Sequence, residues 1–342
     1  MEKSFKACTA CKSRITLVKG LLVMTIIMLM TSCSMADGDD IQESQKSISF
    51  LVSQNDEWMT RGSQAATIST FGVSASVYDA NTTYTTAQCG NYFYCLNATS
   101  GVETPYYWPT SDEKMSFYAY YPYGNANLTV SAATTVGRPI YSYTVPQAIA
   151  SQVDVMTTEV TDRLASNTSN VALTFEHRCS GIRFLVHNQQ SATITVKGIS
   201  VYGVKYAGTY TTGSSWTLTG SVNSSLSYPF TLSTNTNVVA DATLDITGSD
   251  NQFFMLPQTV AAGTDFLYIE TQETVAGDTY NRNYTYTLPE SFSLEMGKVH
   301  IFTLTLGNGQ LSVSNSTSIM DWEPVVEMTN GGVTVSNWQA EE

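Results

Sequence analysis

The chain has 342 residues, 42% of them hydrophobic, which is enough for one large domain or two domains of ordinary size with packed cores. Only 13% of the residues are charged, against a usual share of roughly 25%, and the formal net charge is −13. This acidic balance argues against a protein that binds nucleic acid phosphates or docks on anionic lipid through a basic face.

The first 32 residues have the pattern of a secretory signal, with basic residues before the apolar run LLVMTIIMLM. That run is too short to form a stable membrane-spanning helix. Its exit, MTSC, resembles the lipobox of bacterial lipoproteins, in which the cysteine is lipidated and becomes the first residue. Here that cysteine is Cys33, and Met30 stands where leucine is usual. The alternative is an ordinary signal peptide followed by an unrelated cysteine.

The segment after the signal, residues 33–46, is polar and acidic, and we expect it to be a tether. Three cysteines remain beyond it. In an exported protein Cys89 and Cys95 can close a small disulfide loop, because oxidising compartments preserve such bonds. We expect Cys179 to be a buried, small apolar residue.

From residue 47 onward, short runs alternate apolar and polar residues, and turn residues separate the runs. Ile48, Phe50 and Val52 share one face of the first run. This period of two predicts antiparallel β-sandwiches. The interval 152–170 has little strand pattern and at most a short helical turn, so we place a domain boundary there. The sequence therefore predicts an all-β protein with two sandwich domains in tandem, residues 47–168 and 169–342.

The sequence contains none of the common catalytic or cofactor motifs, such as Gly-x-Ser-x-Gly, a phosphate-binding Gly-rich loop with lysine, or His-Glu-x-x-His. We expect His177, His187 and His300 to be structural residues. The aspartates of residues 241–251 do not have the spacing of a calcium loop and are expected to form a solvated turn. The sequence thus predicts no enzymatic activity, no cofactor and no metal.

The densest aromatic stretch is YYWPTSDEKMSFYAYYPYG. One hypothesis is a platform on which sugars stack, with Trp108 and Tyr120 as members. The interpretation we favour is structural: Phe117 and Tyr121 belong to the core, while Tyr118 and Tyr120 cover the outer face of a sheet.

One arginine is isolated between two predicted strands. Arg61 is the only basic residue between Lys46 and Lys114, and the strand pattern of ISFLV precedes it while that of STFGVSASVYDA follows. Such a residue is a candidate site for a trypsin-like protease. The alternative is an exposed loop arginine that is never cut.

Many segments of the mature chain together resemble the fimbrillin family of Bacteroides-type bacteria. They are ISF, TR, STFGVSASVYD, YYWPTSDEKMSFYAYYP, VDVMTTEV, VALTFEHRCSGIRFLV, GTYTTGSSW, FFMLPQTVAAGT and YTLPESFSLEMGKVHIFTLTL, in that order. The acidic SMADGDD after Cys33 is similar to stretches that direct lipoproteins to the outer surface in these bacteria, although a plain linker would look the same. The resemblance implies two transthyretin-like β-sandwich domains, export as a lipoprotein, and assembly into surface fimbriae for adhesion.

The resemblance also implies a way of polymerising. In the family, a trypsin-like protease cuts after an arginine and removes the first strand, and a C-terminal strand of the next subunit fills the groove. Strand addition satisfies exposed backbone groups and apolar pockets together, and a repeated head-to-tail contact gives an open filament. The corresponding residues here are the scissile pair Arg61 and Gly62, the removable strand with Ile48, Phe50 and Val52, and the candidate donors Leu311, Val313, Val333 and Val335 in the tail 310–342.

We thus expect a structural subunit of a cell-surface fimbrium, anchored in the outer membrane by lipid. Its expected partners are other fimbrial subunits, a trypsin-like surface protease and a host glycan or protein receptor. The alternative is a monomeric surface lipoprotein that acts as a fimbrial tip, an anchor or a glycan-binding adhesin, with the tail serving only as the last strands of its own domain.

Overall fold

The computed structural model describes residues 45–52, 68–81, 90–131, 138–224, 229–248, 251–275, 277–307, 309–318, 333–334 and 338–341. These residues lie in one compact unit that extends from Lys46 to Glu342. The fold is all-β, as the sequence predicts, and in the described ranges the only helical element is one 3-10 turn, η2 (Ile149–Ser151). Across that same part of the chain, no helix has the length and apolar character needed to cross a membrane.

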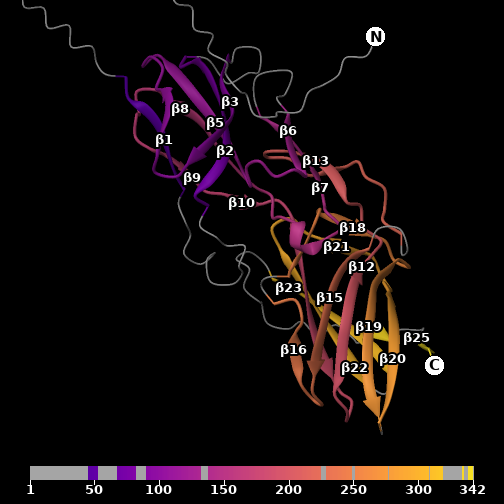
Figure 1. The fold of residues 1–342 in the computed structure, drawn as a ribbon. Coiled ribbons are helices and arrows are strands. Elements are labelled where there is room, and N and C mark those ends of the chain that lie inside the picture. Colours follow the sequence, from indigo (N-terminus) through magenta and orange to yellow (C-terminus); the bar gives the residue numbers. More distant parts are fainter. Residues whose placement is uncertain are drawn as a thin grey trace, which may run out of the picture. The chain divides into compact units, whose positions relative to one another are not determined.

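The first group of strands forms two sheets that are seen together in Figure 1. The three-stranded sheet has the order β4 (Glu103–Tyr107), β1 (Ser47–Val52) and β9 (Val171–Leu173). The five-stranded sheet has the order β10 (Glu176–His177), β8 (Met156–Leu164), β5 (Glu113–Tyr121), β2 (Thr70–Asp79) and β3 (Gly90–Thr99).

The second group also contains two large sheets. One has the order β16 (Thr243–Asp245), β11 (Ser180–Asn188), β22 (Val299–Gly307), β23 (Gln310–Ser318) and β24 (Val333–Thr334), and β17 (Phe253–Met255) also pairs with β11. The other has the order β15 (Phe230–Val238), β12 (Ile194–Val201), β19 (Asp265–Val275), β20 (Asp278–Thr287) and β25 (Trp338–Glu341).

Two smaller sheets complete the described fold. The first has the order β14 (Thr217–Leu218), β13 (Ala207–Thr211), β7 (Ile140–Thr144) and β6 (Leu128–Ser131), and the second pairs β18 (Gln258–Val260) with β21 (Phe292–Leu294). Most pairings are antiparallel, as expected, but β1 runs parallel to β9 and β11 runs parallel to β22.

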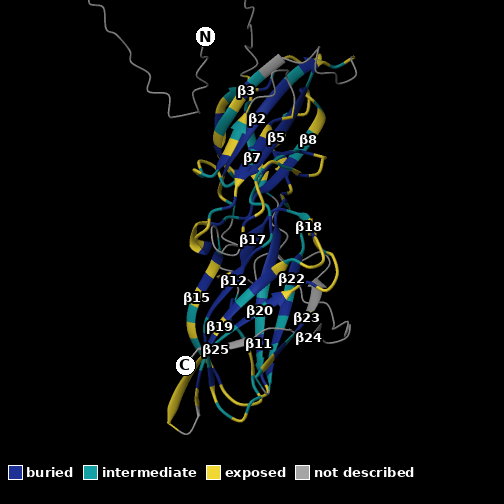
Figure 2. Cartoon of the chain, turned by 90° about the vertical axis from the view of Figure 1, so that its right-hand side faces the viewer, coloured by how far each residue is buried: buried dark blue, intermediate teal, exposed yellow. Residues whose placement is uncertain are grey.

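The apolar side chains of these sheets form two cores. One core surrounds Ile48, Phe50, Phe71 and Phe117, all fully buried. The other is larger and is built mainly by β11, β12, β19 and β22. Figure 2 shows the inner strands of both cores mostly buried, while exposed residues gather in turns and along outer strands.

The alternating pattern is hidden where β8 lies, and here the sequence interpretation is wrong. The interval predicted to be poor in strands holds the nine-residue strand β8, which pairs with β5 along most of its length. Asp162, within β8, has a left-handed backbone with φ of 56°, and the register with β5 shifts between Met115 and Phe117. An irregularity of this kind breaks the period of two, so the pattern cannot be seen in the residue types.

The division into domains at residues 168 and 169 stays a prediction. The larger core takes Tyr120, Tyr141 and Tyr143 from before that position, and β7 pairs with β13, which lies after it. The part of the fold that matters most for function is the first strand and the strands beside it.

Candidate functional site

The first strand, β1, is held as the middle strand of its sheet. Its SISFLV sequence alternates as the period of two demands: Ile48 and Phe50 are fully buried, while Leu51 on the opposite face is 49% exposed. β4 pairs with one edge of β1 in antiparallel fashion, and β9 pairs with the other edge in parallel. A buried middle strand has both of its backbone edges satisfied, and its removal would leave both neighbours open.

Further hydrogen bonds fix the two ends of β1. The Trp108 amide donates to the Lys46 carbonyl at 3.0 Å, and the Gly101 amide donates to the Phe50 carbonyl at 2.8 Å. At the far end, the Val52 amide donates to the Ser100 hydroxyl at 3.1 Å. The residues just after β3 thus hold the end of β1 from which the chain continues toward Arg61.

Aromatic rings surround the buried face of β1. The Phe50 ring packs edge-on against Phe71 at 5.9 Å and against Phe117 at 5.4 Å between ring centroids. Burying an Ile or Phe side chain completely contributes about 1.5–3 kcal/mol each. We call the space that Ile48 and Phe50 fill, between β4 and β9 and beneath them the rings of Phe71 and Phe117, the β1 groove.

The C-terminal strands lie at the edges of the two large sheets of the second group. β23 pairs with β22 along its whole length, and its Leu311 and Val313 are buried in the larger core. β24 is much shorter: Val333 and Thr334 pair with Val313 and Ser312 of β23. β25 pairs with β20 instead.

Several predicted site residues lie outside the described residues: Cys33, Arg61, Gly62, Cys89 and Val335. Their proposed roles, including a disulfide between Cys89 and Cys95, therefore stay predictions. Cys95 itself has a left-handed backbone with φ of 49°, and its amide donates to the Ser74 hydroxyl at 3.1 Å.

Cys179 is buried at 2% exposure, which confirms the prediction for this residue. Burial raises the pKa of its thiol well above the usual value, and the nearby Asp154 carboxylate acts in the same direction. A thiol held protonated is a poor nucleophile, so this side chain serves packing.

The aromatic stretch does not form a surface platform. Trp108 and Tyr120 are only 3% and 5% exposed, so neither offers a ring face to a sugar. Phe117 lies in the core, as expected. Tyr118 and Tyr120 do not cover an exposed outer face: Tyr118 is fully buried, and the Tyr120 ring packs on Tyr141 at 5.7 Å. The physical reason is that β6 and β7 bring a second layer of apolar residues over this face.

The histidines have protein partners. His177 pairs with Asp154, and the His187 Nδ1 lies 2.9 Å from the Thr243 hydroxyl. His300 is fully buried, and its Nε2 accepts a hydrogen bond from the Glu295 amide at 3.0 Å. Burial lowers its pKa to about 4, so the ring is neutral at ordinary pH.

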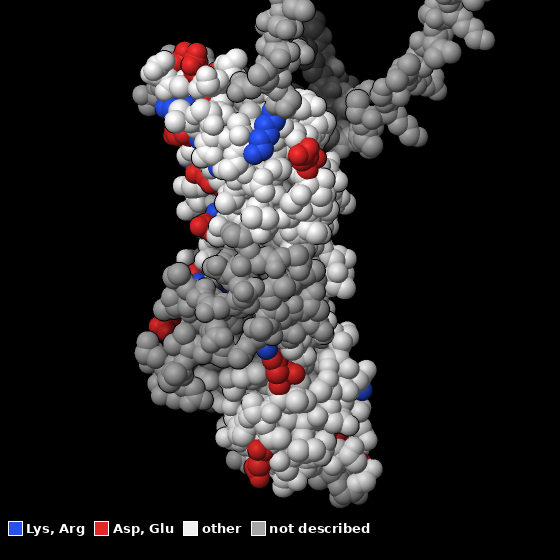
Figure 3. Space-filling view, turned by 90° about the vertical axis from the view of Figure 1, so that its left-hand side faces the viewer, with Lys and Arg blue, Asp and Glu red and all other residues white. Residues whose placement is uncertain are grey.

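Charged groups are few and of both signs on the surface. On the face drawn in Figure 3, the described residues carry scattered Lys, Arg, Asp and Glu side chains without a basic patch. In the aspartate segment near residue 245, Asp245 pairs with Arg183. No group of three or more His, Cys, Asp or Glu side chains suited to a metal occurs within the described ranges.

Sequence reasoning missed two features. The pairing of β1 with β9 joins residues far apart in the chain, and the short apolar run VAL gives no sign of its partner. A polar pocket beside Arg178 was also missed, because its residues come from separate strands and turns.

Comparison with known proteins gives a consistent result. The sequence model of a family described as fimbrillin-like matches residues 40–322. A fimbrial protein from Bacteroides vulgatus has a similar structure, with a TM-score of 0.55 and 18% identity over 80% of this chain and 99% of that chain. A proposed cell adhesion protein from Bacteroides ovatus has a TM-score of 0.49 and 18% identity over 83% of this chain and 100% of that chain. No curated protein matches the sequence.

Proposed function

Because the chain belongs to the fimbrillin-like family, we propose that it is a structural subunit of a cell-surface fimbrium that polymerises by exchange of strand β1. In this proposal it reaches the surface as a lipoprotein anchored through Cys33 in the outer membrane. A trypsin-like protease then cuts the bond between Arg61 and Gly62. Other fimbrial subunits are its partners, and adhesion is its role.

The observation that carries the proposal is the placement of β1. It fills the middle of a sheet, contributes Ile48 and Phe50 to the core, and is followed in the sequence by Arg61 before β2 begins. A cut after Arg61 therefore separates β1 from the rest of the fold without breaking any described strand. β1 is then held by noncovalent contacts alone.

Energetics favour exchange once that bond is cut. The buried side chains of β1 contribute about 1.5–3 kcal/mol each, and each hydrogen bond adds a net 0.5–1.5 kcal/mol or so. A separate peptide must also meet an association cost of about 4–15 kcal/mol, which a covalently attached strand does not. The cleaved strand is thus much easier to displace than the intact one.

The tail contains a better and a poorer donor. β23 pairs with β22 along its whole length and buries Leu311 and Val313, so its release would open the larger core. β24 pairs with β23 through only two residues, Val333 and Thr334. We therefore favour the segment with Val333 and Val335 as the donor, since its departure disturbs the fold least and its apolar residues repeat every second position as Ile48 and Phe50 do.

Limited proteolysis tests the proposal. The purified full-length chain is treated with small amounts of trypsin and examined by electrophoresis in SDS without heating. We expect cleavage at Arg61, followed by a ladder of SDS-resistant oligomers, and no ladder from Arg61→Ala. Arg138→Ala is the matched control, because Arg138 is an exposed arginine paired with Glu159, and it should still give the ladder.

A second variant separates cleavage from exchange. A chain that ends at residue 332 lacks the favoured donor but keeps Arg61, so it should be cut and stay monomeric. Clean cleavage of the complete chain that leaves only monomers would overturn the strand-exchange proposal and favour an uncleaved or terminal subunit instead.

A further inference from the structure

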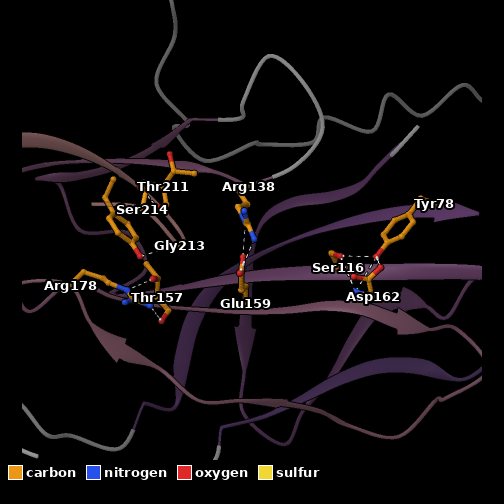
Figure 4. A network of polar contacts seen from close by, with 11 residues as sticks. Tyr78, Ser116, Arg138, Thr157, Glu159, Asp162, Arg178, Thr211, Gly213 and Ser214 are labelled. Carbon is orange, nitrogen blue, oxygen red and sulfur yellow. Dashed lines mark hydrogen bonds and ion pairs between the residues drawn. The ribbon is translucent and has the colours of Figure 1, made fainter. Parts of the chain in front are cut away.

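A polar pocket of 380 Å³ lies where strands β8 and β10 meet the turn that follows β13. Its walls include Thr158 and Glu159 of β8, Glu176 of β10, the next residue but one, Arg178, and Thr212 and Ser214 of the turn. Figure 4 shows Arg178 beside Thr157, with the turn from Thr211 to Ser214 next to it and the Arg138–Glu159 pair further along. Pockets for small ligands have volumes of about 300–1,000 Å³, so this one fits a single small group.

The turn that forms one wall is built rigidly. The Ser214 hydroxyl donates to the Thr211 carbonyl at 2.5 Å, and the Ser214 amide donates to the same carbonyl at 3.0 Å. Gly213 has φ of 80°, a left-handed backbone that glycine adopts without strain. This geometry fixes Thr212 at the wall of the pocket.

Thr212 is the least expected residue of the pocket. It is only 4% exposed, and its hydroxyl has no hydrogen-bond partner among the described residues, although the equally unpartnered Tyr141 hydroxyl is near enough to influence it. Buried hydroxyl groups are normally hydrogen-bonded, and an exception calls for a water or a ligand. The hydroxyl thus marks a place where a hydrogen-bonding group from outside the chain belongs.

Arg178 offers further donors. Its Nε donates to the Thr157 hydroxyl at 2.7 Å, and its Nη2 donates to Glu176 at 2.7 Å. Its guanidinium also lies over the Tyr210 ring at 5.3 Å from the centroid. A guanidinium has five N–H groups, and in the described part of the chain no hydrogen bond engages those of Nη1.

The charges around the pocket balance. Arg138 forms a two-bond pair with Glu159, at 2.8 and 3.0 Å, and Arg178 pairs with Glu176. Two cations and two anions leave no net charge to select an ionic ligand. What remains is a mixture of N–H donors, carboxylate acceptors and hydroxyl groups beside the apolar Met296 side chain.

We propose that this pocket binds one neutral sugar residue. A pyranose carries several hydroxyl groups that both donate and accept, together with an apolar C–H face, and the pocket offers complements to both. The proposal goes beyond filament assembly and does not depend on cleavage at Arg61. It also places sugar recognition away from Trp108 and Tyr120, which the fold buries.

Saturation-transfer NMR on the intact full-length chain tests the proposal. The probes are methyl glycosides of galactose, mannose, glucose and N-acetylglucosamine, with N-acetylneuraminate as the anionic comparison and glucosamine as the cationic one. We expect saturable binding of at least one neutral glycoside, stronger than that of either charged sugar. An absence of saturable binding, or preference for a charged sugar, overturns the proposal.

Thr212→Val removes the unpartnered hydroxyl and keeps the side-chain shape, so the fold should lose no stability. We expect the dissociation constant of the neutral glycoside to rise about fivefold or more, with Tm unchanged. Thr259→Val is the matched control, because Thr259 is an exposed threonine on β18. Equal affinities for the two variants would refute the role of Thr212 and with it the proposed site.

Glu176→Ala provides a second, independent readout. The Glu176 side chain is 66% exposed, so the fold tolerates its loss, but the partner of Arg178 is removed. We expect weaker binding of the neutral glycoside and stronger binding of N-acetylneuraminate, because the pocket then carries a net positive charge. Unchanged binding of both sugars would contradict the assignment.

Discussion

Replacing Phe50 by alanine tests how firmly β1 belongs to the core. The Phe50 ring is fully buried and lies edge-on against Phe71 and Phe117, at 5.9 and 5.4 Å between centroids. Alanine removes the ring and leaves a cavity that the paired strands on both sides of β1 can close only in part. Substitutions of this kind cost about 3–5 kcal/mol, of which the two ring contacts supply about 0.5–1.5 kcal/mol each.

Urea unfolding of the uncleaved full-length chain measures this loss. With a slope of about 3 kcal/mol per molar urea, the midpoint should fall by about 1–2 M. Hydrogen exchange read by mass spectrometry should locate the loss of protection in β2 and β5, whose side chains share the core with Phe50, and leave β12 and β19 unchanged.

The matched control is Leu51→Ala on the same strand. Leu51 is 49% exposed on the opposite face, so its replacement should cost less than about 1 kcal/mol. Equal losses from the two variants, or a loss below about 1 kcal/mol for Phe50→Ala, would refute the packing of β1 described here. After cleavage at Arg61, Phe50→Ala should also form oligomers faster, because the first strand then leaves more easily.

Two further predictions concern buried groups away from β1. Burial lowers the pKa of His300 from 6.5 to about 4, so between these values the unfolded chain binds a proton that the folded chain does not, and stability falls as pH drops. His300→Gln should remove about 2–3 kcal/mol of the difference in unfolding free energy between pH 7 and pH 4.5, and an unchanged difference in urea titrations would contradict this. A Cβ added at Gly72 would lie 2.1 Å from the Tyr120 ring, so Gly72→Ala should cost about 1–3 kcal/mol in thermal or urea unfolding. Adding Tyr120→Ala should make the double variant more stable than the sum of the single losses, and strict additivity would show that the contact is not formed.

Much of the candidate site could be predicted from residue order. The alternation of Ile48, Phe50 and Val52 predicts a strand with one apolar face, and the structure places β1 there with Ile48 and Phe50 fully buried. Residue types alone predict this because the side chains of a strand alternate between two faces whatever its partners are. The same reasoning identified β23 through Leu311 and Val313.

Other parts depend on contacts that residue order does not encode locally. Tyr118 and Tyr120 are polar enough to lie on an outer surface, yet β6 and β7 cover them. β8 escaped notice because Asp162 interrupts its alternation, and Asp162 is held in place by the Tyr78 hydroxyl, which donates to its carboxylate at 2.8 Å. That partner lies on β2, far away in the chain.

The sequence by itself determined that this is an all-β protein, because alternation with a period of two and frequent turn residues leave no other regular structure available. It also determined which side chains of β1 face inward. Only the tertiary structure decided that β1 lies between β4 and β9, that Trp108 and Tyr120 are buried, and that Arg178 and Thr212 share a pocket. The reason is that alternation specifies the two faces of a strand, whereas neighbours are chosen by pairing and packing between distant segments.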